Sequence, residues 1–279
     1  MVITDIQFLV TGFRFEEPMK VAFATITDMD SCIVKVLTDE GITGYGEAAP
    51  LPFVTGDNLG TVLAVGKDLR DAMLGMDPRA IGAVHRVMDR LYTGNGAVKA
   101  GIDIACYDIA AKAAGVPLYK YLGGDDPHIH SDVTIGIDTP EKMAEKALEW
   151  VGKGFDILKV KLGEDVRTDL ERMCAIHEAV SGKARLRIDA NQGWTVKDTL
   201  WISRELASLG VELIEQPVAA GDFEGLREIR MHSPILIAAD ESCHGIRDAM
   251  RLAAALDIIR EVAMEMAPGI RPAMFEKEN

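Results

Sequence analysis

Three acidic residues, each at the end of a short apolar run, have the type and spacing to bind a metal ion. Asp189, Glu215 and Asp240 close the runs LRID, VELIE and ILIAAD. Their intervals are 215 − 189 = 26 and 240 − 215 = 25 residues, about the length of one strand, one helix and two loops in a repeated β/α unit. In a parallel barrel all three carboxylates would meet at one rim, as a site for a hard cation such as Mg²⁺.

Two lysines in the preceding apolar segment add groups that can carry a proton. Lys159 and Lys161 lie two residues apart in DILKVKLG, so on a strand both side chains point to the same face. Burying two ammonium groups in an apolar strand is unfavourable without anions nearby. The three carboxylates supply those anions, so we expect all five side chains in one site.

Each residue also has an ordinary structural explanation. A single Asp at a strand end is commonly a helix cap or a turn residue, and two lysines fit a solvated edge strand. Such explanations would have to apply separately to four segments with the expected spacing. A shared site explains all four together and is therefore the better interpretation. Asn191 either contacts the substrate or orients Asp189, or is a turn residue. Glu241 points away from Asp240 on a strand, so we expect a structural ion pair there.

From about residue 131 onward, strands and helices alternate. The predicted strands are VTIGI (133–137), DILKVKLG (156–163), ARLRIDA (184–190), VELIEQP (211–217) and ILIAAD (235–240). Helical runs begin near Pro140, Val166, Thr195, Asp222 and Gly245. This alternation indicates a parallel sheet covered by helices. Polar groups at the ends of several strands favour a (β/α) TIM-type barrel over a doubly wound sheet.

The first part of the chain predicts a separate α+β domain. ITDIQFLVTGF and SCIVKVLTDEGITGYGEA alternate like strands of an antiparallel meander. Three helical segments follow, and the last ends at the Gly-Val-Pro of residues 115–117. The Gly- and Asp-rich GGDDPH at 123–128 predicts a linker. We therefore place an α+β domain at 1–125 and a partial (β/α) barrel domain at 126–279.

Composition argues against several classes of protein. The 279-residue chain carries a net charge of −14, which disfavours nucleic acid or an anionic membrane as a partner. No apolar run approaches the roughly 18 residues of a membrane span, and the N-terminus lacks the features of a signal peptide. The four scattered cysteines contain no CxxC, which indicates reduced thiols. We expect a cytoplasmic protein.

The order and spacing of these motifs resemble the enolase superfamily, in the muconate-lactonizing subgroup that carries a Lys-x-Lys motif. KVK at 159–161 is followed by RIDANQGW, IEQP and AADES. The N-terminal part is similar to the family's capping domain, including GYGEAAPLPFVTGD at 44–57. Within the subgroup, that loop, GIDTPE and DANQGW are most similar to dipeptide (L-Ala-D/L-Glu) epimerases.

The resemblance implies a Mg²⁺-dependent isomerase or epimerase that abstracts the proton alpha to a carboxylate. It implies Asp189, Glu215 and Asp240 as metal ligands, Lys161 as the acid/base residue and Lys159 as its charged neighbour. A small carboxylate such as a dipeptide is the implied substrate. We also expect a homo-oligomer.

The C-terminal part departs from the family pattern. A barrel that begins at residue 131 has 279 − 130 = 149 residues, against about 250 for a typical (β/α)8 barrel, so we expect an incomplete barrel with exposed strand edges. The family's sixth strand carries a second lysine, for which the corresponding residue here is Ala263. Apolar residues at helical spacing predict instead one helix from about 245 to 266.

Three functions remain open from the sequence. The first is an epimerase that exchanges an α-proton on one face but racemises poorly, because protonation of the other face needs a second donor. The second is a muconate cycloisomerase or an o-succinylbenzoate synthase. The resemblance implies that these enzymes use the same lysines and the same metal. The third is a catalytically silent, metal-binding, oligomeric remnant.

Overall fold

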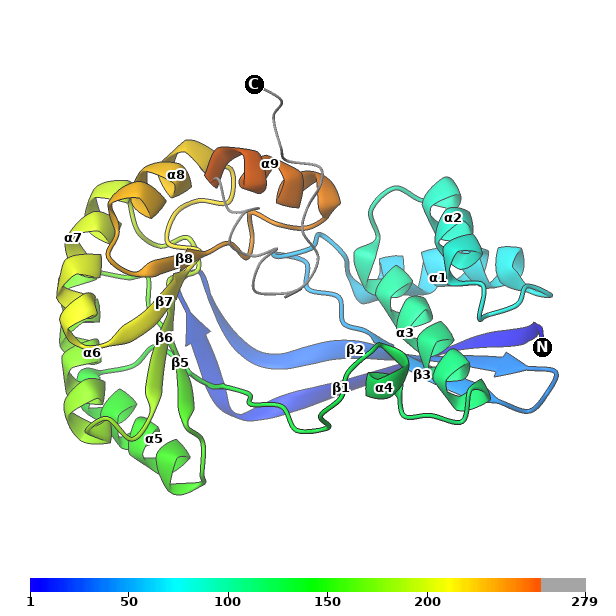
Figure 1. Ribbon diagram of the computed structural model, residues 1–279, viewed down its shortest axis with the longest axis horizontal. Helices are drawn as coiled ribbons and strands as arrows, with labels where there is room; N and C mark the ends of the chain where they lie inside the picture. The colour runs from blue at the N-terminus through cyan, green and yellow to red at the C-terminus, as the bar shows by residue number, and fades with distance from the viewer. Residues whose placement is uncertain (257–279) are drawn as a thin grey trace. The chain divides into compact units, whose positions relative to one another are not determined.

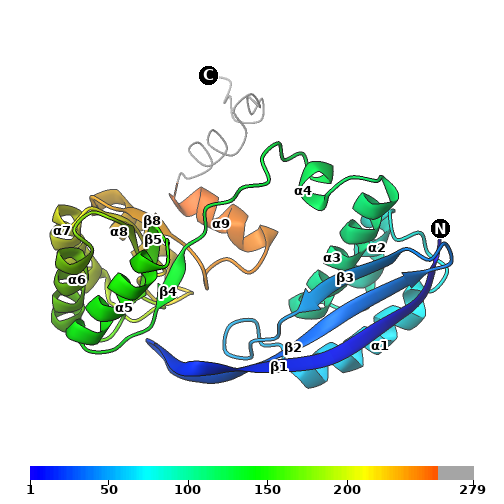
Figure 2. The same cartoon turned by 90° about the horizontal axis from the view of Figure 1, so that it is seen from below.

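The structure is a computed structural model that describes residues 1–256 of the chain. The chain forms two compact units, whose elements are labelled in Figure 1 and, for β4, in Figure 2. The first unit contains Met1–Glu17 and Thr27–His130, and the second contains Pro18–Ile26 and the residues from Ser131 onward. A short hairpin from the N-terminal strands therefore groups with the second unit. The domain boundary at 125/126 stays a prediction.

The first unit is built on a three-stranded sheet in the order β1-β2-β3, in which β2 and β3 are antiparallel. Its strands are β1 (Ile3–Val21), β2 (Ala24–Thr38) and β3 (Thr43–Ala48), and its helices are α1 (Leu59–Met73), α2 (Ile81–Leu91), α3 (Gly96–Ala113) and α4 (Leu118–Tyr121). The sheet and the three longer helices share one apolar core. The predicted meander and its three following helices are confirmed.

Two glycines in β3 let α3 pack directly on the sheet. A Cβ atom added to Gly44 would lie 2.0 Å from the backbone oxygen of Ala105, and one added to Gly46 would lie 2.0 Å from that of Gly101. Because both neighbours are backbone atoms, any side chain at either glycine would push the helix away from the sheet.

The second unit is a parallel β/α repeat. Its sheet has the order β4-β5-β6-β7-β8, with every neighbouring pair parallel. The strands are β4 (Val133–Ile135), β5 (Ile157–Lys161), β6 (Arg185–Asp189), β7 (Val211–Glu215) and β8 (Leu236–Ala238). The helices are α5 (Pro140–Gly152), α6 (Val166–Val180), α7 (Val196–Ser208), α8 (Phe223–His232) and α9 (Ile246–Leu256). All five predicted strands and the predicted helix starts are present, and Figure 2 shows the sheet curved with its helices outside.

Strand alternation gives this sheet one apolar and one polar face. Leu158, Val160 and Ile188 are fully buried and belong to the core that the sheet shares with its helices. Burial of each such side chain contributes roughly 1.5–3 kcal/mol. Because neighbours along a strand face opposite ways, Lys159 and Lys161 lie on the other face of β5.

Capping side chains fix where four of these helices begin. Each accepts a hydrogen bond from a backbone N–H in the first turn, which stabilises a helix by about 1 kcal/mol. The caps are Thr139, Asp165, Thr195 and Asp222, at the starts of α5, α6, α7 and α8. Short capped loops therefore follow β4, β5, β6 and β7 at the carboxyl end of the sheet.

The predicted helix over 245–266 is described in part. Helix α9 covers Ile246–Leu256, and the rest of that prediction lies outside the described residues, as does Ala263, the residue that corresponds to the second lysine of the family. Within residues 1–256, β4 and β8 are the outer strands of the parallel sheet. None of the helices described there is long and apolar enough to cross a membrane.

Candidate active site

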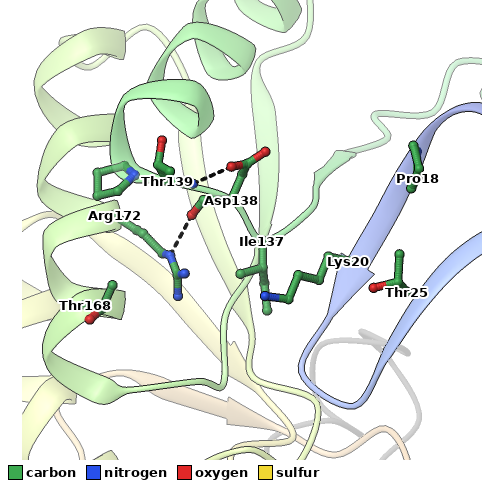
Figure 3. A pocket seen from close by; sticks show the side chains of 9 residues that line it. Pro18, Lys20, Thr25, Ile137, Asp138, Thr139, Thr168 and Arg172 are labelled. Carbon is green, nitrogen blue, oxygen red and sulfur yellow. Dashed lines mark hydrogen bonds between the residues drawn. The ribbon is translucent and has the colours of Figure 1, made fainter.

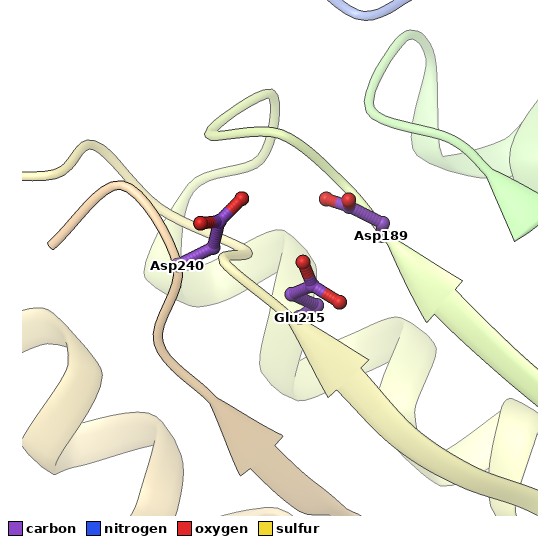
Figure 4. Close-up of side chains that lie close together, drawn as sticks. All are labelled: Asp189, Glu215 and Asp240. Carbon is purple, nitrogen blue, oxygen red and sulfur yellow. The ribbon is translucent and has the colours of Figure 1, made fainter. Parts of the chain in front are cut away.

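The ends of three neighbouring strands bring the predicted acidic residues together. Asp189 ends β6, Glu215 ends β7, and the two are direct partners across the parallel ladder. Asp240 lies two residues beyond Ala238, the ladder partner of Glu215. One carboxylate oxygen from each residue lies within 4.8 Å of the others, and Figure 4 shows the three side chains converging.

Both lysines of β5 reach this group, as their position on one face of the strand predicts. Lys161 Nζ lies 2.6 Å from Asp189 Oδ2 and donates to Asn191 Oδ1 at 3.0 Å. Lys159 Nζ donates to Glu215 Oε1 at 2.8 Å and lies 3.0 Å from Asp189 Oδ2. Asp189, which is fully buried, therefore pairs with both ammonium groups.

Burial and charge act in opposition on these groups. Burial raises the pKa of Asp189, but the charges and hydrogen bonds of Lys161 and Lys159 outweigh it, so the pKa lies below its ordinary value. Burial raises the pKa of Glu215, and repulsion from Asp189 and Asp240 adds to this against the opposing Lys159. Burial lowers the pKa of Lys159, but bonds to Glu215 and Asp189 reverse this and raise it.

The three carboxylates fit a hard divalent cation. All the donor atoms are oxygens, which Mg²⁺ and Ca²⁺ prefer. Burial is the main cause of the raised pKa of Glu215, and Asp189 and Asp240 add repulsion, which a bound cation would relieve. Asp240 is exposed, so a substrate could approach the cation from its side.

Asn191 lies inside the site, in a buried turn that follows β6. It is 6% exposed and has a left-handed backbone with φ of 40°, which is strained for a residue other than glycine. Its N–H donates to Asp189 Oδ1 at 3.0 Å, and its side chain contacts Lys161 and Glu241. The predicted turn is present, and the roles of contacting substrate and of orienting Asp189 stay predictions.

The prediction of an ion pair for Glu241 is not met within the described residues. Its Oε1 accepts a hydrogen bond from Asn191 Nδ2 at 3.1 Å, so its described partner is a neutral amide.

Gln216 supports the site and was not predicted. Its Oε1 accepts from the backbone N–H groups of Asp240 at 2.9 Å and Ser242 at 3.1 Å, and its Nε2 donates to Val218 O and Ser242 Oγ, both at 2.8 Å. This fully buried amide holds the Asp240 loop against β7. The only signal for Gln216 in the sequence is its position directly after Glu215.

A buried carboxylate on α6 connects two loops of the site. Asp169 Oδ2 accepts from Gly163 N at 3.0 Å, Glu164 N at 3.1 Å and Trp194 Nε1 at 2.9 Å. Gly163 and Glu164 follow Lys161, and Trp194 belongs to the loop after Asp189. Asp169 therefore ties the loop after β5 to the loop after β6.

Arg172, one turn along the same helix, extends this connection to the loop after β4. It donates to Asp169 Oδ1 at 2.7 Å, to Glu164 Oε2 at 2.8 Å and to the backbone oxygen of Asp138 at 2.8 Å. Asp169 and Arg172 share a helix face with buried Met173 and Ile176. Charged residues on an apolar helix face were the sequence pattern that could have revealed them.

The pocket in Figure 3 lies apart from the predicted residues. It measures about 570 Å³, and its lining combines Pro18, Lys20 and Thr25 of the hairpin with Ile137, Asp138, Thr139, Pro140, Thr168 and Arg172. Lys20 Nζ lies 2.6 Å from Glu164 Oε1, and its backbone oxygen accepts from Ile137 N at 2.8 Å. The pocket lies where the hairpin contacts the rest of the second unit. The candidate catalytic and metal-binding residues lie instead at the ends of the strands.

Both parts of the chain match known families. Residues 4–123 match the mandelate racemase/muconate lactonizing enzyme N-terminal domain, and residues 142–274 match the enolase C-terminal domain-like family. A hydrophobic dipeptide epimerase from Enterococcus faecalis is 42% identical over 252 residues, which cover 90% of this chain and 71% of that protein.

Two further comparisons agree. The crystal structure of the dipeptide epimerase from Enterococcus faecalis V583, complexed with Mg and the dipeptide L-Leu-L-Tyr, superposes with a TM-score of 0.89 at 42% identity, covering 91% of this chain and 72% of that one. An N-succinyl-L-Arg/Lys racemase from Bacillus cereus is 35% identical over 280 residues, 98% of this chain and 75% of that protein. The predicted fold class, an α+β capping domain followed by a TIM-type β/α domain, is confirmed. The chain belongs to the mandelate racemase/muconate lactonizing enzyme family of the enolase superfamily.

Proposed function

We propose that this protein is a Mg²⁺-dependent enzyme of the dipeptide epimerase type, which abstracts the proton alpha to a carboxyl group. The observation that carries the proposal is the position of Lys161, whose Nζ lies 2.6 Å from Asp189 Oδ2, beside a group of three carboxylates that fits the cation. A group that carries a proton and a site for a divalent cation are what α-proton abstraction needs.

Each side chain has a distinct part in this reaction. Asp189, Glu215 and Asp240 would hold Mg²⁺, which when bound supplies positive charge to the substrate carboxylate as negative charge develops there. In its neutral amine form, Lys161 accepts the α-proton on Nζ, and the resulting ammonium can return it. Lys159 remains paired with Glu215 and keeps positive charge beside the site.

The substrate class follows from the relatives. The similar Enterococcus faecalis protein is a dipeptide epimerase whose structure holds Mg and a dipeptide, and the similar Bacillus cereus protein is a racemase of N-succinyl-L-Arg/Lys. Both names describe an amino-acid α-carbon next to a carbonyl and an amide nitrogen. A dipeptide is therefore our first substrate, and an N-succinyl amino acid is the second candidate.

Exchange on one face of the α-carbon is the expected outcome. Lys161 serves that face, whereas the sequence has Ala263 where the family carries its second lysine. Without a second donor, protonation from the other face should be slow. The expectations of a homo-oligomer and of a cytoplasmic location stay predictions from the sequence.

The test is incubation of the purified protein with Mg²⁺ in D2O, separately with L-Ala-L-Glu, L-Leu-L-Tyr and N-succinyl-L-Arg. Proton NMR follows loss of the α-proton signal, and chiral chromatography follows epimer formation. We expect deuterium incorporation with little epimerisation. Lys161→Ala should abolish incorporation, whereas the exposed Lys197 provides the matched control Lys197→Ala.

Two outcomes would each contradict a different part of this expectation. Rapid epimerisation would overturn the inference from Ala263 while leaving the reaction class intact. No incorporation with any of the three compounds would favour a metal-binding remnant without activity. A cycloisomerase would instead consume a muconate without exchanging these α-protons.

A further inference from the structure

The side chain of Asn191 lies between the proposed proton-carrying lysine and a buried glutamate. Lys161 Nζ donates to Asn191 Oδ1 at 3.0 Å, and Asn191 Nδ2 donates to Glu241 Oε1 at 3.1 Å. An amide offers an acceptor on one side and a donor on the other. The three side chains therefore form one directed series of hydrogen bonds.

The acceptor at Glu241 decides which way the Asn191 amide faces. If the amide turned over, its NH2 group would meet the ammonium of Lys161, and its oxygen would meet the carboxylate of Glu241. Both contacts would be repulsive. The backbone of Asn191 is held separately, by its bond to Asp189 Oδ1, and this bond does not distinguish the two amide orientations.

The burial of Glu241 sets this contact apart from an ordinary surface hydrogen bond. Glu241 and Asn191 are each 6% exposed, so water competes little for either group. Among the described residues, Oε2 of Glu241 is buried without a hydrogen-bond partner, which is unfavourable for a carboxylate. Within the part of the chain that the structure describes, the bond to Asn191 is thus the side-chain hydrogen bond of this buried carboxylate.

We infer that Glu241 is a positioning residue for Lys161, which acts by fixing the side-chain amide of Asn191. Asn191 Oδ1 then holds Nζ of Lys161 in the position from which it accepts the α-proton of the substrate. The effect on turnover rests on the proposed function, whereas the effect on the Asn191 amide does not.

The kinetic test compares two substitutions of Glu241. Glu241→Leu removes the acceptor, and misplacement of a catalytic group by about 1 Å can slow a reaction about 100-fold, so we expect kcat for deuterium exchange to fall about 10- to 100-fold with a smaller change in KM. Glu241→Gln keeps an amide oxygen in place of Oε1 and should retain most activity. In an Asn191→Ala background, Glu241→Leu should cause no further loss.

Three kinetic results would overturn the inference: unchanged exchange in Glu241→Leu, equal losses in Glu241→Leu and Glu241→Gln, or additive losses with Asn191→Ala. Thermal unfolding and Mg²⁺ titration calorimetry of each variant show whether a loss reflects misfolding or a lost cation. An effect transmitted through Asn191 leaves both close to wild type.

A second measurement decides the inference even if the wild-type protein exchanges no proton. The side-chain NH2 of Asn191 gives a pair of ¹H–¹⁵N NMR signals, identified by their loss in Asn191→Asp. We expect these signals to shift in Glu241→Leu and to move less in Glu241→Gln. Unshifted signals in Glu241→Leu would show that Glu241 does not hold the amide.

Discussion

At the residue scale, two lysines on one strand face have different surroundings. Lys161 contacts Asp189 and the neutral Asn191, whereas Lys159 bridges the carboxylates of Asp189 and Glu215. The motif predicts that both point the same way, because strand alternation is a local property. Their partners depend on β6 and β7, so the sequence alone could not separate a proton carrier from a counter-ion.

Lys159→Met tests the counter-ion role. The change leaves Asp189 and Glu215 as adjacent, poorly solvated carboxylates, so the metal-free protein should lose about 3 kcal/mol of unfolding free energy. Mg²⁺ should restore much of this loss, because the cation binds the same oxygens. Urea unfolding with EDTA and with Mg²⁺ measures both effects, with Lys197→Met as the control. Equal destabilisation in both conditions would contradict the prediction.

At the element scale, α6 does more than cover the sheet. Asp169 and Arg172 connect the loops after β4, β5 and β6, and two of these loops follow Lys161 and Asp189. Helical periodicity predicts α6 and its buried face, but does not predict which backbone groups meet that face. Loop conformation depends on such long-range contacts, which is why Asp169 and Gln216 escaped prediction while the strands and helix starts did not.

Asp169→Ala tests this connection. Removal of Asp169 takes one of two carboxylate partners from Arg172, which keeps Glu164, and leaves three donors unsatisfied, so we expect a loss of about 3–5 kcal/mol of unfolding free energy. Glu171→Ala, an exposed position on the same helix, should have little effect. Urea unfolding of the two variants provides the comparison, and similar losses in both would contradict the prediction.

Glu164 gives the same region a pH dependence. The hydrogen bond from Lys20 lowers the pKa of Glu164, burial opposes this, and Arg172 lowers it further, so the pKa lies below its ordinary value of 4.5. A carboxyl with a lowered folded pKa stabilises the protein above its unfolded pKa, and this contribution is lost as pH falls through the folded value.

Glu164→Gln should therefore be less stable than wild type at neutral pH, and the difference should shrink as pH falls below about 4.5. Thermal unfolding between neutral and acidic pH measures this difference. Glu205→Gln, which is exposed on α7, should show no such pH-dependent gap. A gap that widens in acid would reverse the predicted sign.

At the scale of the whole molecule, the repeat spacing of the acidic residues predicts the parallel β/α architecture and the gathering of the candidate site. The spacing works because each unit repeats strand, loop and helix. The assignment of Pro18–Ile26 to the second unit was not predicted, since nothing local in a hairpin indicates its distant partners. Those partners are Ile137 and Glu164, which contact Lys20.

A cut in the linker tests this connection. Residues 123–128 are exposed, so a protease site inserted there should be cleaved readily. We expect the two fragments to elute together in native size-exclusion chromatography, because the hairpin of the first fragment remains bound to the second. They should separate in urea. Separate elution under native conditions would show that the hairpin contacts do not hold the fragments together.

The polypeptide passes between the two units three times, after Glu17, after Ile26 and after His130. A gene fragment that begins at residue 131 would thus encode the β/α unit without the hairpin of residues 18–26, which belongs to it. Chimaeras that exchange the C-terminal half between relatives must take residues 18–26 from the same parent as that half. The two segments are far apart in the gene but have to be exchanged together.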